Sequence, residues 1–221
     1  MTLANDSIQK AADVSGPLVA THAPGDGKEY QVVMLADESG HLQQTLPTYS
    51  WWTASQAVGA NKLFADIFNA SGSGKVLEVR GIWAIPKSDT AVTATLGVEI
   101  GIYRTSAVGT AGTAAGYNNG TASTSNVITP WDTNNSALPA QVTARTTPTG
   151  GATIASLYWA QFIWMEETNA PATAISAFTN LMPVGTMNQR ITLREGQGLL
   201  YKQGGVAGAG NLHFLTLFTL V

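Results

Sequence analysis

The sequence contains no cysteine, and this absence excludes several kinds of chemistry. Without a thiol the chain has no disulfide, no cysteine nucleophile, no cysteine-ligated zinc and no iron–sulfur cluster. Histidine is scarce as well, because His22, His41 and His213 lie far apart and no two of them have the spacing of paired metal ligands. The sequence therefore predicts no redox pair, no metal site and no other cofactor.

Charged residues make up only 11% of the chain, against a globular norm of about a quarter. The net charge is -3, and the Lys and Arg residues are scattered singly. A nucleic-acid or membrane-surface partner requires a basic cluster, so we expect neither. No apolar run approaches the roughly 18 residues of a membrane span, and the first residues lack the apolar segment of a signal peptide. We therefore expect synthesis in a cytoplasm without export.

In place of charge, the 221 residues include 44% hydrophobic residues and 23 glycines, with many Thr, Ser and Asn. Apolar and polar residues alternate with a period of two, which predicts strands. These are expected at 30–37, 62–68, 75–87, 91–108, 154–168, 190–195, 198–203 and 211–221. Helical periodicity is nearly absent. The prediction is an all-β protein, an antiparallel β-sandwich of jelly-roll type with an extended N-terminal arm.

Residues 1–60 are expected to form this arm and a connecting strand, and residues 61–221 the sandwich domain. Pro17, Pro24 and three glycines argue against regular structure at 15–27. The segment 46–61 is interpreted as irregular. Within 75–87, the alternation predicts one set of inward residues: Leu77, Val79, Trp83 and Ile85.

The expected strand 154–168 carries large apolar residues on both faces. One parity contains Leu157, Trp159 and Ile163, and the other contains Tyr158, Phe162 and Trp164. A strand of this kind is buried on both faces or lies against a second chain. We favour a core or subunit contact for Trp159 and Trp164.

Candidate catalytic motifs fail on their spacing. The run 69–75 resembles a phosphate-binding loop, but Asn69 replaces its first glycine and Val76 replaces the Ser or Thr after the lysine, which favours a hairpin turn. Glu166 and Glu167 project to opposite faces of a strand, so they do not flank one glycosidic bond. Asp37, Glu38 and His41 surround one turn, where such residues are common without a cation. We therefore predict that the protein is not an enzyme.

Trp51, Trp52 and Trp131 are the candidate site residues. They lie in segments interpreted as irregular, where a tryptophan stacks on a sugar ring, anchors a protein interface or fills a core. For Trp51 and Trp52 the alternatives stay open.

Three segments resemble auxiliary virion proteins of tailed bacteriophages, namely the decoration, cement and fibre-associated proteins. They are the hairpin region 61–87, the closing region 190–220 and the arm segment 30–42. The resemblance implies a jelly-roll-like sandwich that forms a homotrimer, binds the major capsid protein and stabilises the head shell on the virion surface. The alternative is a tail or head-fibre module that recognises host glycan through Trp51, Trp52 or Trp131.

Overall fold

The computed structural model describes residues 18–22, 30–34, 46–87, 96–118, 126–149, 154–165, 179–182, 190–208 and 210–221. Throughout these residues the regular structure is β-strand, which confirms the all-β prediction. No helix long and apolar enough to cross a membrane occurs in this described part of the chain. The chain divides into two compact units, Met1–Thr45 and Leu46–Val221.

The first unit contains one antiparallel pair, β1 (Leu18–His22) and β2 (Tyr30–Met34). β2 begins where the alternation predicted, but β1 lies in the segment for which Pro17 and Pro24 argued against regular structure. That prediction was wrong for residues 18–22, because the two prolines flank the five residues of β1 and do not interrupt them.

The described residues of the second unit form fourteen strands. They are β3 (Thr48–Trp52), β4 (Gln56–Ala57), β5 (Leu63–Asn69), β6 (Leu77–Lys87), β7 (Leu96–Thr105), β8 (Thr113–Ala114), β9 (Gly116–Tyr117), β10 (Val127–Pro130), β11 (Val142–Thr146), β12 (Ile154–Met165), β13 (Thr179–Asn180), β14 (Ile191–Leu193), β15 (Gln197–Gln203) and β16 (Asn211–Leu220).

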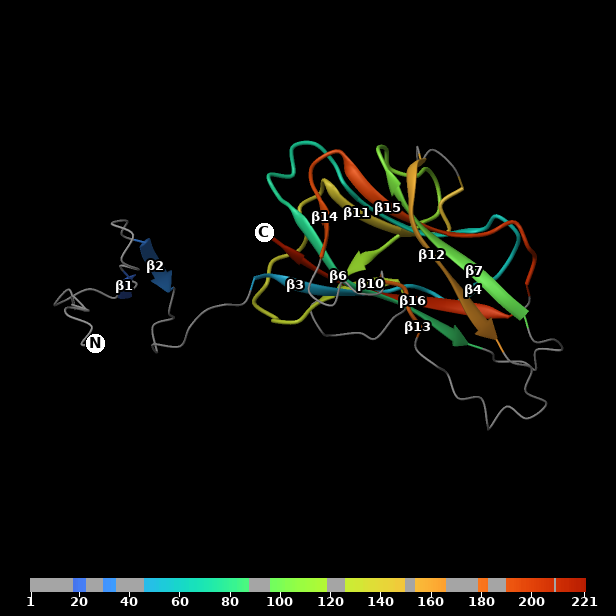
Figure 1. Cartoon of the computed structure of the whole chain (residues 1–221). Helices are drawn as coiled ribbons and strands as arrows, with labels where there is room; N and C mark the ends of the chain where they lie inside the picture. Colours follow the sequence, from blue (N-terminus) through green and yellow to red (C-terminus); the bar gives the residue numbers. More distant parts are fainter. Residues whose placement is uncertain are drawn as a thin grey trace, which may run out of the picture. The chain divides into compact units, whose positions relative to one another are not determined.

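These strands form two sheets that pack face to face (Figure 1). The eight-stranded sheet has the order β13-β6-β16-β3-β10-β9, with β14 also paired to β6 and β4 to β16. The six-stranded sheet has the order β12-β7-β15-β5-β11-β8. The pairings are antiparallel apart from β10 with β9. Successive strands cross repeatedly between the two sheets, and the unit is a β-sandwich, as predicted.

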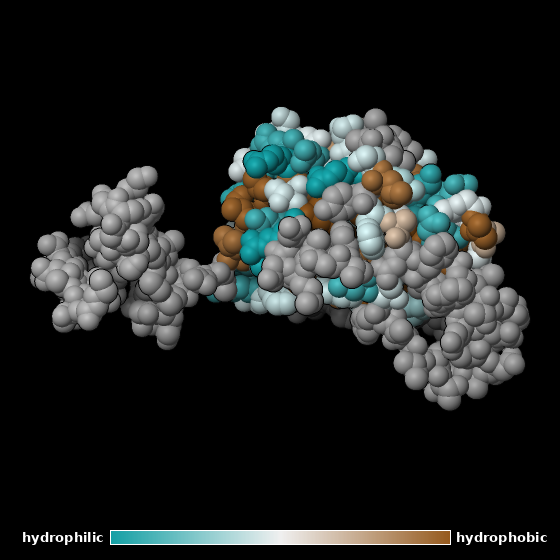
Figure 2. All heavy atoms as spheres, viewed as in Figure 1, coloured by the Kyte–Doolittle hydropathy of each residue, from teal (hydrophilic) through white to brown (hydrophobic). Residues whose placement is uncertain are grey.

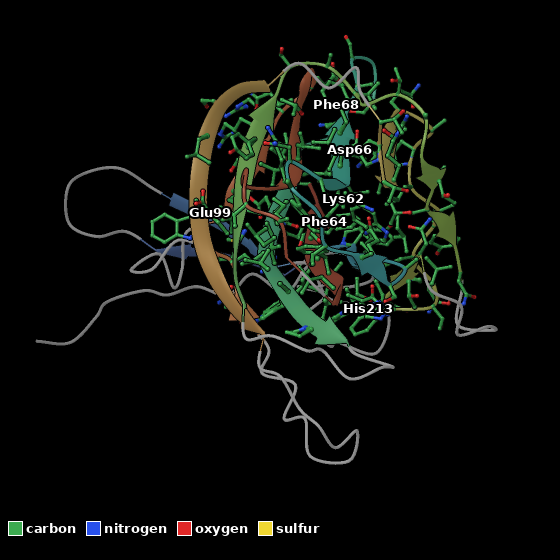
Figure 3. The ribbon with its side chains drawn as sticks, turned by 90° about the vertical axis from the view of Figure 1, so that its right-hand side faces the viewer. Lys62, Phe64, Asp66, Phe68, Glu99 and His213 are labelled. Carbon is green, nitrogen blue, oxygen red and sulfur yellow. The ribbon has the colours of Figure 1, made fainter. Side chains whose placement is uncertain are left out.

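The core lies between the sheets and contains a group of aromatic rings. The ring of Phe214 on β16 lies 5.2 Å from that of Phe64 and 5.5 Å from that of Tyr201. Phe64 is an extra residue in β5, because the register with β15 shifts between Tyr201 and Lys202, and it is fully buried (Figure 3). The Tyr201 hydroxyl is 2.9 Å from that of Thr216, and burial raises the pKa of Tyr201.

A second register shift changes which residues of β6 face the core. Leu217 of β16 pairs with Gly81 and Phe218 pairs with Val79, so Arg80 is the extra residue. A one-residue slip reverses the facing of every later side chain. The predicted inward set is therefore half right. Leu77 and Val79 lie in the core, whereas Ile82 and Ala84 replace Trp83 and Ile85 there.

The sandwich unit begins at Leu46, not at residue 61 as expected. The interpretation of 46–61 as irregular was wrong, because β3 pairs with both β16 and β10 inside the eight-stranded sheet. Tyr49 and Trp51 alternate on its buried face. Ser, Thr and Pro around these aromatics concealed the period of two.

Candidate interaction surfaces

Trp51 is a core residue. Its side chain is fully buried, and its indole Nε1–H donates a hydrogen bond of 3.2 Å to the Oδ1 of Asn126. Because a buried indole offers no face to a ligand, the structure removes Trp51 from the candidate site residues.

Trp52 faces the other side of β3 and belongs to a row of apolar side chains on the outer face of the eight-stranded sheet. Leu215 pairs with Trp52 on one side and with Trp83 on the other, and all three are half-buried. Trp83 was missed because unbroken alternation along β6 placed it inward, whereas the slip at Arg80 turns it outward. A glycine two positions before a tryptophan was the available signal, since a Cβ on Gly81 would lie 2.1 Å from the indole of Trp83.

His213 supports Trp52 on this outer face. The two rings are 5.3 Å apart with an interplanar angle of 31°. The His213 side chain is buried, and its Nδ1 lies 2.9 Å from the Thr53 carbonyl oxygen, which accepts the ring hydrogen. We therefore assign His213 a packing role.

Trp131 is the exposed tryptophan of the three candidates, with 69% of its surface accessible. It directly follows β10, and its backbone N–H donates to the Thr48 carbonyl oxygen at 2.9 Å. The structure does not bring it to Trp52, since Trp52 pairs with Val127 at the far end of β10. Four residues of strand separate them, or about 13 Å.

Two tyrosine hydroxyls hold the loop that presents Trp131. Tyr49 donates to the Ser136 carbonyl at 2.9 Å, and Tyr117 donates to the Asn135 carbonyl at 2.5 Å. Burial, and next the neighbouring Tyr117, raise the pKa of Tyr49, so the Tyr49 hydroxyl keeps its proton at neutral pH. Trp131 is thus an exposed ring on a loop fixed by side chains of the sheet.

The same loop carries polar groups beside the indole. Asp132 accepts the Asn134 backbone N–H on its Oδ1 at 2.9 Å, which closes a local turn. Asp132, Thr133 and Asn134 are all exposed. Carboxylate, hydroxyl and amide groups next to an exposed indole are a combination that binds sugar hydroxyls while the ring stacks.

Two more exposed apolar residues lie at this end of the sandwich. They are Leu46 and Val221. Their chain neighbours are joined by a hydrogen bond, since the Pro47 carbonyl accepts the Leu220 N–H at 2.9 Å. Trp131 is joined to the neighbouring Thr48. Figure 2 shows hydrophobic atoms at the end of the sandwich where Figure 1 places the C-terminus. We call Leu46, Trp131 and Val221 the terminal patch.

The strand with two apolar faces, β12, lies at the edge of the six-stranded sheet. Among the described strands it pairs only with β7, and two register shifts precede Trp159. Leu157 is 53% exposed. The indole Nε1–H of Trp159 is buried without a hydrogen-bond acceptor. The residues from Trp159 to Met165 are in continuous register with β7, so β12 presents a long, regular edge.

The outer face of the six-stranded sheet, by contrast, is covered by the chain itself. Asp66 on β5 is 2% exposed there, and its Oδ2 accepts the Gly109 N–H at 2.7 Å. Arg145 Nε lies 3.4 Å from Asp66 Oδ1, and Arg145 also donates to the Gly109 carbonyl. Burial raises the pKa of Asp66, while the Gly109 bond and Arg145 oppose the rise. The group fastens the loop after β7 onto the sheet.

The glycine-rich turn at 69–75 binds a carboxylate of its own chain. Glu195 accepts the backbone N–H groups of Gly72 at 3.1 Å and Gly74 at 2.7 Å. These two bonds and the Ser73 hydroxyl lower the pKa of Glu195. The turn joins β5 to β6, but β5 belongs to the six-stranded sheet and β6 to the eight-stranded sheet, so the hairpin interpretation was wrong and the turn crosses between the sheets. Glu195 occupies the donors that a phosphate would need.

The remaining sequence candidates receive no structural account. Asp37, Glu38, His41, Glu166 and Glu167 lie outside the described residues. Within the described ranges, no group of three or more His, Asp or Glu side chains is placed to hold a metal ion.

Comparisons with protein families, with curated proteins and with solved structures found no match for this chain. The fold is an antiparallel β-sandwich, and the resemblance to phage virion proteins stays a prediction.

Proposed function

We propose that the protein is a structural virion protein, a decoration or cement protein that binds the major capsid protein and stabilises the head shell of a tailed phage. The observation that carries the proposal is the terminal patch. Trp131 is 69% exposed, yet two tyrosine hydroxyls hold its loop. A fixed, exposed tryptophan is a typical interface anchor, because it buries a large area and loses little conformational freedom on binding.

The first measurement is the copy number of this chain in purified virions, by mass spectrometry, relative to the major capsid protein. A ratio of the same order as the capsid protein supports shell decoration. A handful of copies per virion contradicts it and favours a tail or fibre location.

The second measurement is virion incorporation of Trp131→Ala. We expect a loss of at least tenfold, since an interface anchor contributes about 2 kcal/mol or more. The matched control is Val206→Ala, which removes an apolar side chain that is 74% exposed in the loop between β15 and β16. Equal incorporation of the two variants would remove the terminal patch from the docking surface.

The N-terminal unit provides a separate test. Residues Met1–Thr45 form a compact unit of their own. In a decoration protein such a unit adds affinity as a tethered second contact. Deletion of residues 1–45 should abolish incorporation and leave a folded sandwich, which circular dichroism verifies. Unchanged incorporation would contradict this role.

A second function is favoured by the polar groups beside Trp131. In a receptor-binding module, the indole stacks on a host glycan while Asp132 and Asn134 bind its hydroxyls. The isolated protein should then bind host polysaccharide, and Trp131→Ala should abolish binding while Trp131→Phe retains part of it. Absence of binding to host cells and their polysaccharides would exclude this function.

A further inference from the structure

The sandwich unit protects its described sheet edges, with one exception. The edge strands β4, β8, β9 and β13 have two residues each, and β14 has three. Short edge strands prevent unwanted pairing with other chains. β12 has twelve residues, is paired on one side only among the described strands, and contains no proline and no charged residue. Its two register shifts lie before Trp159, so the stretch from Trp159 to Met165 lacks the usual protections of a free edge.

We propose that β12 is an interface between two copies of this chain, which pair antiparallel through their β12 edges around a two-fold axis. The six-stranded sheets of the two copies then form one continuous sheet. This inference goes beyond the proposed function and does not depend on shell docking.

An unpaired sheet edge binds another extended strand, because the backbone N–H and C=O groups of that strand pair with those of the edge. The occupant must also be uncharged over a similar length. A second β12 meets both conditions, whereas the other described sandwich strands of comparable length are paired on both sides.

The edges also determine the symmetry. A ring of three subunits joined through sheet edges needs two different edges on each subunit, a head and a tail. The other described sandwich edges have two or three residues and offer no second surface of this length. When copies of this chain pair with one another through sheet edges, the one long edge of each copy therefore pairs with the identical edge of another copy. The geometry favours a two-fold pair over the homotrimer that the resemblance implied.

The register of the pair has a definite centre. Two shifts disturb β12 before Trp159, so the continuous stretch from Trp159 to Met165 is best suited for pairing. An antiparallel pair of this stretch has its two-fold axis close to residue 161 or 162. With the axis at residue 161, this residue lies directly opposite its own copy. With the axis at residue 162, residue 161 lies opposite residue 163 and is a diagonal neighbour of its own copy.

The absence of native cysteine allows a direct test on the full chain. Wild-type protein at tens of micromolar should have twice the chain mass of 23.1 kDa by light scattering. Single-cysteine variants at Ala160, Gln161 and Phe162 locate the axis, and the variant whose cysteine lies opposite its own copy should form disulfide-linked dimers most efficiently under mild oxidation. Directly opposite residues of antiparallel strands have Cα atoms about 4.5–5.5 Å apart, within disulfide range. Ala207→Cys, in the exposed loop before β16, is the control and should stay monomeric on gels.

Charge variants test the same pairing without cross-linking. Gln161→Lys and Gln161→Glu should each raise the dimer dissociation constant about tenfold, because like charges meet across the axis. An equal mixture of the two variants should restore the dimer. A monomeric or trimeric wild type, or cross-linking of Ala207→Cys as efficient as at 160–162, would overturn the proposal. The solution measurements and the virion measurements are independent, so failure of one proposal is distinguishable from failure of the other.

Discussion

The two sheets of the sandwich leave different parts of themselves uncovered. The middle of the outer face of the six-stranded sheet is covered, since Asp66 and Leu200 there are at most 2% exposed. One edge of the same sheet is the long, uncharged strand β12. The eight-stranded sheet ends in strands of two or three residues and carries half-buried Trp52 and Trp83 on its outer face. The difference teaches that the faces and the edges of a sheet are protected independently, so each sheet offers its own kind of contact.

The largest loss of unfolding free energy is expected when the outer face of the six-stranded sheet is uncovered. Asp66→Ala leaves Arg145 without its carboxylate and the Gly109 N–H without its acceptor. Breaking a buried ion pair costs about 3–5 kcal/mol of unfolding free energy. Asp66→Asn keeps an oxygen acceptor for Gly109 and should lose less in chemical denaturation. Equal losses would mean that the Gly109 bond contributes nothing.

A smaller loss of unfolding free energy is expected from a substitution on the outer face of the eight-stranded sheet. Gly81→Ala places a Cβ 2.1 Å from the Trp83 indole, which must move. Such overpacking costs about 1–3 kcal/mol. In a Trp83→Ala background the same change should be nearly neutral, because the clash is gone. A double-mutant cycle measures this coupling, and additive losses would contradict the stacking of Trp83 over Gly81.

The covered face should also have a pH signature. The pKa of Asp66 is raised above its ordinary value of 3.8, chiefly by burial. The stability gained by protonating Asp66 in the folded state is therefore fully present below pH 3.8 and is lost as the pH rises through the raised folded pKa, while the contacts with Gly109 and Arg145 remain. The unfolding free energy of the wild type, relative to Asp66→Asn, should increase as the pH falls from 7 to about 4. A decrease over this range, in denaturant titrations at several pH values, would contradict the raised pKa.

The smallest effect is expected at the exposed turn between β5 and β6. The pKa of Glu195 is lowered by the Gly72 and Gly74 amides, so its contribution is present above the ordinary value of 4.5 and is lost as the pH falls through the lowered folded pKa. Glu195→Gln should speed amide hydrogen exchange at Gly72 and Gly74 at neutral pH, with little change in thermal unfolding. Unchanged exchange would mean that the carboxylate does not hold the turn.

The strand positions were largely predictable, since β5, β6, β7, β15 and β16 coincide with segments of strong alternation. β3 was missed because Ser and Thr separate its buried aromatics. Trp83 was placed on the wrong face because the slip at Arg80 depends on how β16 pairs with β6, and Gly81 was the only local signal of it that we find.

The candidate site was predictable in part. Trp131 precedes a turn-forming segment, and its exposure agrees with that context, whereas Trp51 looked equivalent in sequence and is buried. The clamp by Tyr49 and Tyr117 joins residues 87 and 18 positions apart in the chain to their carbonyl partners. Contacts of this sequence separation follow from sheet assembly and leave no pattern in a short window.

By itself, the sequence determined the all-β class, the positions of the strongly alternating strands and the lack of charge on β12, because period-two alternation and composition are local properties. Only the tertiary structure decided that β12 lies at an edge, that Trp51 and Trp52 face opposite sides, and that Arg80 reverses the facing of β6. Each of these depends on which distant strand supplies the hydrogen bonds, and a strand's own residues do not specify its neighbour.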